Sequence, residues 1–521
     1  MARGLTRGTL KHAGVYGSAA VASKAVGFLM LPVYAHLFRD SGYGQIAMVD
    51  TSLSLVLSLL ANGVGGAMMR YYHAETGDRR KSVVPTGIVL VAVPALAIAT
   101  LAMIFSKPLS QLLLGDAASY PLICLGFGTF FFDLTANTAS SILLIQRRSV
   151  VYSLIGLAQL LVSIGLNIWL LLVLKLGLLG YFLTNFLVAI CAALTFGWFC
   201  VRECGFPLRK DVARELLQYQ WPLVPGALVA WVAGQIESLI VRFSISLGGV
   251  GRMQMGMKFP SLITLLIAEP FMRSWVTKQF ELAEADPDAA RIQSGRMFTT
   301  YMFFLLFASL VVAACVDSVL RVFTPSEFWW SSRIARIQIV TVILGACYSY
   351  LNFGLMYAKA THILAVQRGV SACGKTLLSL LFVGMWGMDG VALAGCISAA
   401  LLLVFGTRRS QKFFRQRLEY RRVATLIFIA VAMYLLIGHG PVQSLPGIKS
   451  LEHFVSVQVV DFLKSTALAD WNSGQIVQAV ATRSMDATLL LVKLALCLTF
   501  GFTAPLAHPE MLRGLRRRLG R

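Results

Sequence analysis

Long apolar runs, separated by short segments that carry charge or glycine, recur along this chain from one end to the other. A run of about 20 apolar residues is what a helix needs to cross the hydrocarbon core of a bilayer. Of the 521 residues, 57% are hydrophobic and only 13% are charged, whereas a soluble domain is about one quarter charged. The alternating ten-residue segments of an outer-membrane barrel are missing. The sequence therefore predicts an all-α, polytopic membrane protein.

The apolar runs predict about 14 transmembrane helices. Their approximate bounds are 12–38, 45–69, 83–105, 119–145, 150–174, 177–201, 219–246, 255–278, 297–322, 334–358, 361–384, 388–407, 423–438 and 487–507. The first run is too long for the apolar region of a cleaved signal peptide, so we expect it to be retained.

Basic residues are concentrated in the loops on one side of these predicted spans. The net charge is +22, but the positive residues lie in short loops between apolar runs, which favours the positive-inside rule and anionic lipid over nucleic acid as the explanation. The loops on the other side hold few cations. These are Arg39, Lys107, Lys175, Arg252, Arg333 and Arg336. The asymmetry predicts that both termini are cytoplasmic.

Two pairs of glycine-bearing segments recur at nearly the same spacing. Gly44 and Gly251 each lie in a hinge between two apolar runs, at an offset of 207 residues (from 44 to 251). Gly177 and Gly387 each follow an apolar run, at an offset of 210 (from 177 to 387). Nearly equal offsets predict two six-helix bundles related by a pseudo-two-fold axis, an arrangement typical of transporters.

The repeat sets the predicted domain boundaries. The N-terminal bundle is expected over 1–205 and the C-terminal bundle over 206–422. Two further helices are expected over 423–521, with an external segment at 439–486 and a basic cytoplasmic tail.

Several short motifs resemble those of the Wzx-type polysaccharide flippases, which belong to the multidrug/oligosaccharidyl-lipid/polysaccharide exporter superfamily. The likeness covers residues 10–410. The motifs are the run Gly27–Phe38 with its Gly42-Tyr43-Gly44 hinge, Met69-Arg70-Tyr71-Tyr72, Gln235-Ile236-Glu237, Met257-Lys258-Phe259-Pro260, Phe271-Met272-Arg273-Ser274-Trp275, and the segments Gly177–Gly180 and Gly387–Gly390. The long 439–486 segment departs from the family pattern.

The resemblance implies a transporter and not an enzyme. Its cargo would be an isoprenoid-diphosphate-linked oligosaccharide, moved by alternating access from the cytoplasmic to the periplasmic leaflet of a bacterial inner membrane for exopolysaccharide, capsule or O-antigen assembly. The expected partners are this cargo, membrane lipid and other polysaccharide assembly proteins.

Charged residues inside apolar spans are the candidate site residues, because such charges usually face a cavity or a partner. In the family, the first helices of each half line the central cavity, so the resemblance suggests a cationic track for the diphosphate group. Its candidates are Lys24, Arg242, Lys258, Arg273 and Lys375. Ion coupling or charge pairing is expected of Asp133, Glu237 and Glu269. For Glu269 and Arg273 the alternative is a simple ion pair on one helix face, because they are four residues apart.

No cofactor, metal or ATP is expected. Residues 369–376 fit the pattern G-x-x-x-x-G-K-[ST] of a phosphate-binding loop. That loop belongs to a parallel sheet in a soluble domain, so we interpret the match as part of a membrane helix. The histidines and cysteines show no metal-ligand spacing.

Three other functions remain open. A cation-coupled multidrug exporter and a lipid II flippase are alternatives within the same superfamily. A polysaccharide polymerase is the alternative from another class, since such enzymes carry acidic and Arg residues on a large external loop. The 439–486 segment offers Glu452, Asp461, Asp470, Arg483 and Asp486.

Overall fold

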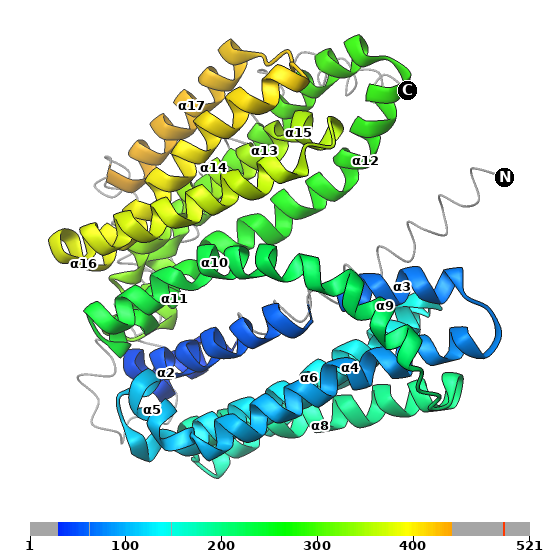
Figure 1. Cartoon of the computed structure of the whole chain (residues 1–521). Helices are drawn as coiled ribbons and strands as arrows, with labels where there is room; N and C mark the ends of the chain where they lie inside the picture. The colour runs from blue at the N-terminus through cyan, green and yellow to red at the C-terminus, as the bar shows by residue number, and fades with distance from the viewer. Residues whose placement is uncertain (1–29, 62, 147, 440–492, 495–496, 498–521) are drawn as a thin grey trace, which may run out of the picture. The chain divides into compact units, whose positions relative to one another are not determined.

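The computed structural model describes residues 30–61, 63–146, 148–439, 493–494 and 497. The chain divides into two compact units, unit 1 up to Gly251 and unit 2 from Arg252. Helices form the regular structure of the described residues in both (Figure 1). This confirms the all-α prediction. The predicted domain boundaries stay a prediction.

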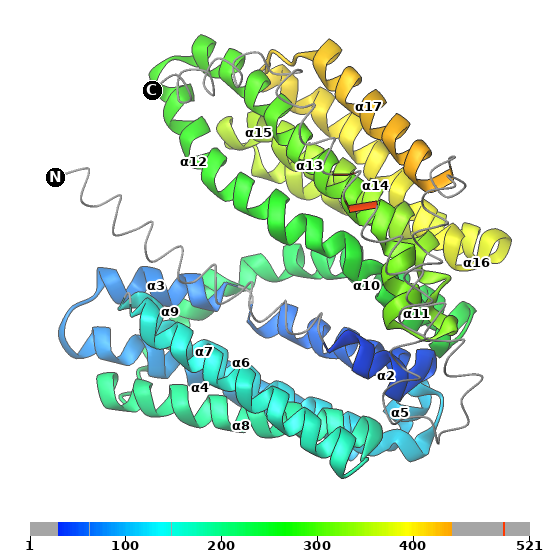
Figure 2. The ribbon, with the colours of Figure 1, turned by 180° about the vertical axis from the view of Figure 1, so that it is seen from behind.

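Unit 1 is built from long helices joined by short turns. Helices α4, α6 and α8 lie side by side, and α7 also packs against α6 and α8 (Figures 1 and 2). The elements are α2 (Leu31–Leu60), α3 (Val64–Ala74), α4 (Gly77–Ile104), α5 (Ser106–Leu114), η1 (Ala117–Ser119), α6 (Tyr120–Ile145), α7 (Ser149–Asn167), η2 (Ile168–Val173), α8 (Gly177–Cys204), α9 (Lys210–Gln220), η3 (Trp221–Leu223) and α10 (Val224–Ser244). Helix α11 (Leu247–Ile263) crosses the boundary between the units.

Unit 2 follows the same plan of long, closely packed helices. Helix α14 packs against α13 and α16, and α13 also packs against α17. The elements are η4 (Thr264–Ala268), α12 (Glu269–Ala285), α13 (Pro287–Phe323), η5 (Ser326–Phe328), α14 (Ser331–Leu351), α15 (Phe353–Tyr357), α16 (Thr361–Phe413) and α17 (Tyr420–His439).

Local sequence explains where several of these helices begin. The 37-residue helix α13 starts at Pro287, whose fixed φ suits a first helical position. The preceding Asp286 accepts hydrogen bonds from the backbone N–H groups of Asp288 and Ala289, both at 3.0 Å. The side chain thus satisfies two donors that have no partner inside the helix.

Nine helices in the described part of the chain are long and apolar enough to cross a membrane. One of them, Thr361–Phe413, contains two predicted spans, because α16 continues through a kink at Gly387. The phosphate-loop pattern at 369–376 lies inside this helix. The predicted first span is described only from residue 30, and the last lies almost wholly outside the described residues. The total of fourteen therefore remains a prediction.

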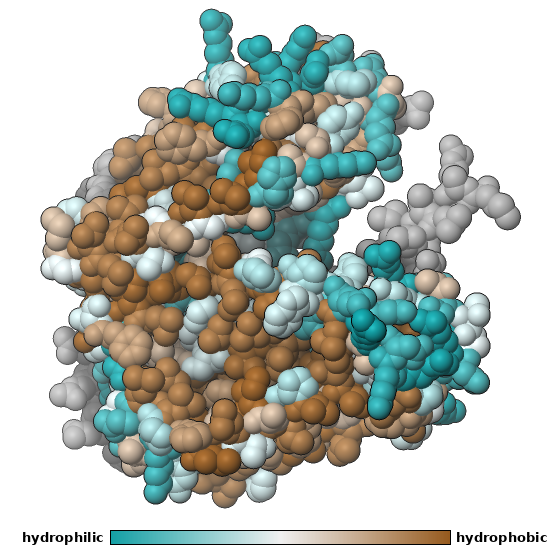
Figure 3. Space-filling model, in the orientation of Figure 1, coloured by the Kyte–Doolittle hydropathy of each residue, from teal (hydrophilic) through white to brown (hydrophobic). Residues whose placement is uncertain are grey.

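The outer helix faces of unit 1 are apolar, as a membrane requires. On α4, Val93, Leu101 and Ile104 are 62%, 56% and 70% exposed. Apolar residues spread over α4, α6 and α8 in Figure 3, while polar residues gather around α3 and α9. Exposed apolar side chains on this scale would be costly in water and are favourable against lipid.

The polar end of unit 1 carries paired charges. Arg79, at the start of α4, lies 2.6 Å from Glu215 and 3.8 Å from Asp211, both on α9, and 3.3 Å from Glu75. Arg148 pairs with Glu203 at 2.9 Å. All these residues lie in segments predicted to be cytoplasmic.

The two glycine hinges of the sequence repeat meet in unit 1. A Cβ atom added to Gly44 would lie 2.0 Å from the carbonyl oxygen of Leu247, and one added to Gly251 would lie 2.0 Å from that of Asp40. Each hinge thus needs glycine because the other hinge's backbone passes next to it. The second pair also agrees in conformation, since Gly177 and Gly387 have φ angles of 56° and 58°, in the region that favours glycine.

Candidate functional site

A cavity of about 820 Å³ lies among α2, α6, α7 and α8 of unit 1. Its size falls within the range of ligand pockets. Helix α6 contributes the most lining residues, from Gly126 to Ser140, and α8 closes one side with residues from Phe182 to Phe196. All the described residues that line the cavity therefore belong to helices of one compact unit.

Asp133 projects into this cavity at the middle of α6. It is about 18–20 Å from either end of the helix at 1.5 Å per residue, yet its side chain is exposed. Within the part of the chain that the structure describes, its carboxylate makes no hydrogen bond or ion pair. A charge at mid-membrane costs several kcal/mol unless water or a partner solvates it. The cavity is where such solvation is available.

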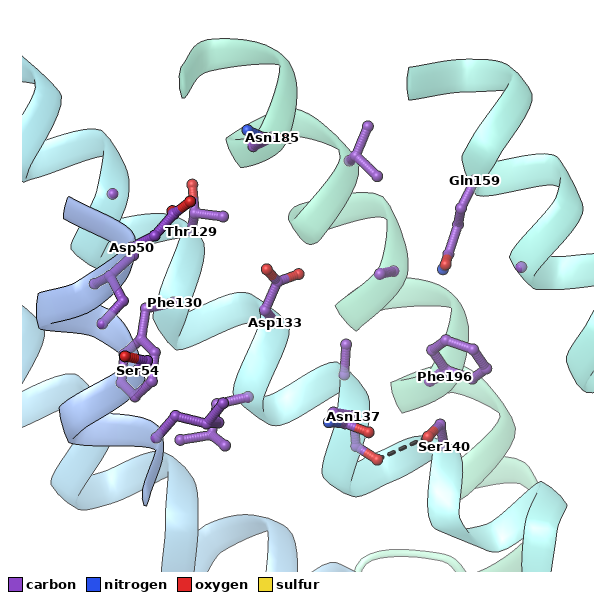
Figure 4. Close-up of a pocket in the computed structure, with 18 of the residues that line it drawn as sticks. Asp50, Ser54, Thr129, Phe130, Asp133, Asn137, Ser140, Gln159, Asn185 and Phe196 are labelled. Atoms are coloured by element: carbon purple, nitrogen blue, oxygen red, sulfur yellow. Dashed lines mark hydrogen bonds between the residues drawn. The ribbon is translucent and has the colours of Figure 1, made fainter. Parts of the chain in front are cut away.

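A second carboxylate, Asp50 of α2, lines the same cavity and is also exposed. Three amide side chains accompany the acids, namely Asn137, Gln159 and Asn185. The Nε2 atom of Gln159 is buried without a hydrogen-bond partner among the described residues. Figure 4 shows Asp133 on α6 and Gln159 on α7 pointing toward the same space. An acceptor and a donor are thus both left for a ligand or for water.

Other polar atoms of the wall are already engaged. The hydroxyl of Ser140 donates to the carbonyl of Asn137 at 2.7 Å, and that of Thr129 donates to Leu125 at 2.7 Å. Ser54 donates to the Thr51 carbonyl at 2.7 Å and accepts from Nε1 of Trp231 on α10 at 2.9 Å. These bonds fix part of the wall. The Asp133 carboxylate and the Nε2 atom of Gln159 are the groups that are left for a ligand or for water.

The described lining residues include no Lys, Arg or His. Lys24 lies outside the described residues. Arg242, at the end of α10, donates from Nε to the carbonyl of Leu113 at 2.7 Å. Leu113 is in the last turn of α5, where a cation stabilises unpaired carbonyl groups.

The other predicted site residues lie elsewhere. Glu237 on α10 is fully buried. In unit 2, Arg273 is 81% exposed and pairs with Glu269 at 3.1 Å, as the four-residue spacing suggested. Lys258 on α11 and Lys375 on α16 are half-buried. Of the predicted residues that the structure describes, Asp133 lines the cavity, and Glu269 and Arg273 form an ion pair.

Sequence reasoning missed most of the cavity's polar groups. Asp50 gave a signal, since it is a charge inside an apolar run. Asn137, Gln159 and Asn185 gave almost none, because neutral polar residues in spans commonly bond to their own helix. Asn167 does so, donating to the carbonyl of Ser163 at 2.8 Å.

No group of three or more His, Cys, Asp or Glu side chains that could hold a metal ion occurs within the described ranges. In the cavity wall the two carboxylates stand on different helices, α2 and α6.

Comparison with solved structures finds membrane proteins that have a similar fold. The chain is similar to the lipid II flippase MurJ in an inward closed conformation, with 15% identity and a TM-score of 0.70 over 94% of this chain and 99% of that one. It is also similar to an inward-facing multidrug resistance MATE family transporter of the MOP superfamily, with 13% identity and a TM-score of 0.58 over 78% and 96% of the chains. A MATE in complex with MaL6 gives 13% identity and a TM-score of 0.55 over 80% and 95%.

Comparison with the curated proteins finds no match. The sequence model of the family described as "Polysaccharide biosynthesis protein" matches residues 9–276, more than half of the chain, and confirms the resemblance drawn from the glycine and helix motifs. The chain therefore belongs to the polysaccharide biosynthesis protein family, a family of multi-pass membrane transporters and not of enzymes.

Proposed function

We propose that this protein is a flippase that moves an isoprenoid-diphosphate-linked oligosaccharide from the cytoplasmic to the periplasmic leaflet of a bacterial inner membrane. The cargo would serve exopolysaccharide, capsule or O-antigen assembly. The observation that supports this most is the family match over residues 9–276 combined with a cavity of about 820 Å³ at mid-helix depth, whose wall carries carboxylate and amide side chains. A lipid-linked glycan needs such a space, because its sugar hydroxyls cannot cross hydrocarbon unsolvated.

Alternating access is the proposed mechanism, with the bundles rocking about a site at mid-membrane. The diphosphate group would need cations, and the described cavity wall of unit 1 has none. Lys258, Arg273 and Lys375 are the proposed contacts among the described residues of unit 2, together with Lys24. Arg242 of unit 1 is a further candidate, and its Nε atom donates to the carbonyl group of Leu113.

Deletion of the gene, followed by analysis of lipid-linked intermediates, tests the proposal. Lipid-linked repeat units should accumulate on the cytoplasmic face, where an added membrane-impermeant glycosidase cannot reach them in intact spheroplasts, and polymer should disappear. Restoring the gene should reverse both effects. Normal polymer levels would contradict the proposal.

The same experiment separates the alternatives. A lipid II flippase would cause lipid II to accumulate instead of repeat units. A polymerase would leave single repeat units on the periplasmic face, accessible to the glycosidase. A multidrug exporter would leave polymer unchanged and raise sensitivity to cationic drugs.

A further inference from the structure

The turn between α16 and α17 of unit 2 carries a dense set of positive charges, and we name it the basic turn. It covers residues 408–422 and contains seven cations and one acid, Glu419. The cations, all of them exposed, are Arg408, Arg409, Lys412, Arg415, Arg417, Arg421 and Arg422. Hydrophilic residues gather in Figure 3 over the end of unit 2 where α16 ends and α17 begins. The loop charges predict that this end is cytoplasmic.

The middle of the basic turn is extended and presents two arginines on one face. Helix α16 ends at Phe413, and Phe414 has a φ of −143° and a ψ of 100°. Phe414 and Gln416 are 2% and 3% exposed, whereas Arg415 and Arg417 are exposed. Side chains alternate between the two faces of an extended chain, so both arginines project from the same face, about 7 Å apart along the chain.

Unit 2 holds this extended segment in place from its buried side. The ring of Phe414 packs against that of Phe353, with centroids 5.2 Å apart. The backbone N–H of Arg417 donates to the carbonyl of Arg291 on α13 at 3.1 Å. A Cβ atom at Gly295 of α13 would overlap the carbonyl oxygen of Arg417, so the segment lies directly on the backbone of that helix. The arginines therefore extend from a fixed base, which reduces the ordering cost of binding a ligand.

The described residues neutralise little of this charge. The acid of the basic turn, Glu419, lies 2.7 Å from Arg422, and within the described ranges the other six cations form no ion pair. The acids at the start of α13 serve that helix. Asp286 accepts from its first backbone N–H groups, and Asp288 pairs with Arg291 at 2.9 Å.

The sequence outside the described residues adds little negative charge on the cytoplasmic side. Residues 1–29 contain no acid, and residues 498–521 contain one, Glu510. The acids of residues 440–492 precede the last predicted span, so they are expected on the opposite side of the membrane. Anions that balance the basic turn are therefore expected from outside the chain.

Apolar side chains border the basic turn on both helices. On α16, Phe405 is 63% exposed and precedes Arg408 by three residues, or about 5 Å along the helix axis. On α17, Phe428 is 74% exposed and follows Arg421 by seven residues, or about 10 Å. Tyr420, also 74% exposed, is of a type that lies at headgroup level. A phospholipid can thus place its phosphate on the turn and its acyl chains along the two helices.

We infer that the basic turn is a binding site for the phosphate group of an anionic phospholipid, with Arg415 and Arg417 as the contact residues. A guanidinium group binds a phosphate through two parallel N–H···O bonds, which gives a defined geometry that a diffuse attraction to a membrane lacks. The site goes beyond the proposed function and does not depend on it. A lipid that binds only the folded protein also stabilises it.

Lipid binding to the purified full-length protein in detergent, measured by native mass spectrometry, tests the inference. The probes are dioleoyl-phosphatidylglycerol and dioleoyl-phosphatidylcholine, which share their acyl chains and differ in net charge. Phosphatidylglycerol should bind about tenfold more tightly, because each cation near an anionic headgroup adds to its affinity. Equal binding of the two lipids would overturn the inference.

A double variant then locates the site. Arg415→Gln/Arg417→Gln should weaken binding of phosphatidylglycerol by about tenfold, since it removes two phosphate contacts, and should leave phosphatidylcholine unaffected. Lys210→Gln/Arg214→Gln is the matched control, because it removes two exposed cations from α9, where acids lie among the cations. The control should change the affinity by less than about twofold. Equal losses in both double variants, or no loss in the first, would show a diffuse attraction and overturn the site.

Farnesyl diphosphate distinguishes a phospholipid from the proposed cargo as the occupant. It carries a diphosphate on a short isoprenoid chain, so it stands in for that part of the cargo. We expect it to displace phosphatidylglycerol no better than added phosphatidylglycerol does. If it competes at lower concentration, and Arg415→Gln/Arg417→Gln removes the effect, the turn binds the cargo and the phospholipid assignment fails. Neither result decides the flippase proposal, because the deletion experiment measures lipid-linked intermediates and makes no use of this turn.

Discussion

Helix α2 has two contrasting neighbourhoods within a few turns. At Gly44 it touches the backbone at the start of α11 so closely that no Cβ fits, with 2.0 Å to the Leu247 carbonyl oxygen. From Asp50 to Leu57 the same helix borders a cavity of about 820 Å³. We infer that the two regions have different roles. Close packing at Gly44, the tight end, fixes the position of α2, and the stretch from Asp50 to Leu57, the open region, borders space for a ligand.

The largest expected effect is at the tight end. Gly44→Ala should lower the free energy of unfolding by about 1–3 kcal/mol or more, because overpacking forces backbone shifts. Thermal unfolding of the purified protein in detergent measures it. The matched control is Gly156→Ala on α7, which lines the cavity and has nothing within 4 Å of the added Cβ. Equal losses in both variants would remove the distinction between the two regions.

Filling the open region should affect transport and leave stability nearly unchanged. Gly156→Trp places a large side chain in the cavity, and we expect about a tenfold loss of export, equivalent to about 1.4 kcal/mol. The readout is the ratio of lipid-linked intermediate to finished polymer in complemented deletion cells. Wild-type export in a stably folded Gly156→Trp protein would show that the cavity is not on the transport path.

Along the cavity stretch of α2, side-chain hydrogen bonds link this helix to α10, among them one from Thr51 to Gln235 at 3.4 Å and one from Trp231 to Ser54. Trp231→Phe removes the indole N–H that donates to Ser54 at 2.9 Å, and about 1 kcal/mol of stability should be lost. Unfolding in detergent again gives the value. Trp221→Phe is the control, since Trp221 is 75% exposed. A loss no larger than that of the control would show that the cavity wall does not depend on this bond.

The contrast along α2 also shows what the sequence could and could not predict. The glycine repeat predicted that Gly44 and Gly251 are equivalent, and the structure shows each facing the other's hinge. The repeat could not predict that they touch, because equal spacing carries no information on distance. Arg242 is a similar case. Its role depends on α5, a short helix in a segment that apolar periodicity marks only as a loop.

The cavity was predictable only through its charges. Asp133 stands out in an apolar run because a buried carboxylate is costly, so sequence alone marks it. Asn137 and Asn185 do not stand out, since an amide in a membrane helix can bond to its own backbone. That they share a space with Asp133 follows from the packing of α6 against α8, which no local pattern encodes.

The smallest expected effect lies away from both neighbourhoods of α2, at the exposed pair on α12. Arg273 and Glu269 are 81% and 51% exposed and lie 3.1 Å apart. An exposed pair of this spacing contributes only about 0.3–0.5 kcal/mol, so Arg273→Ala and Glu269→Gln should leave the unfolding temperature almost unchanged. Measuring export distinguishes the two possible roles of this pair, which are a contact between Arg273 and the diphosphate and a simple ion pair on α12. If Arg273 contacts the diphosphate, Arg273→Ala should lower export by about twofold to threefold, since a contact worth about 0.5 kcal/mol corresponds to that factor. Glu269→Gln frees the guanidinium and should not lower export. Equal export in both variants would show that the pair serves only α12, and the diphosphate contact would then have to be sought at Lys258, Lys375 or Lys24.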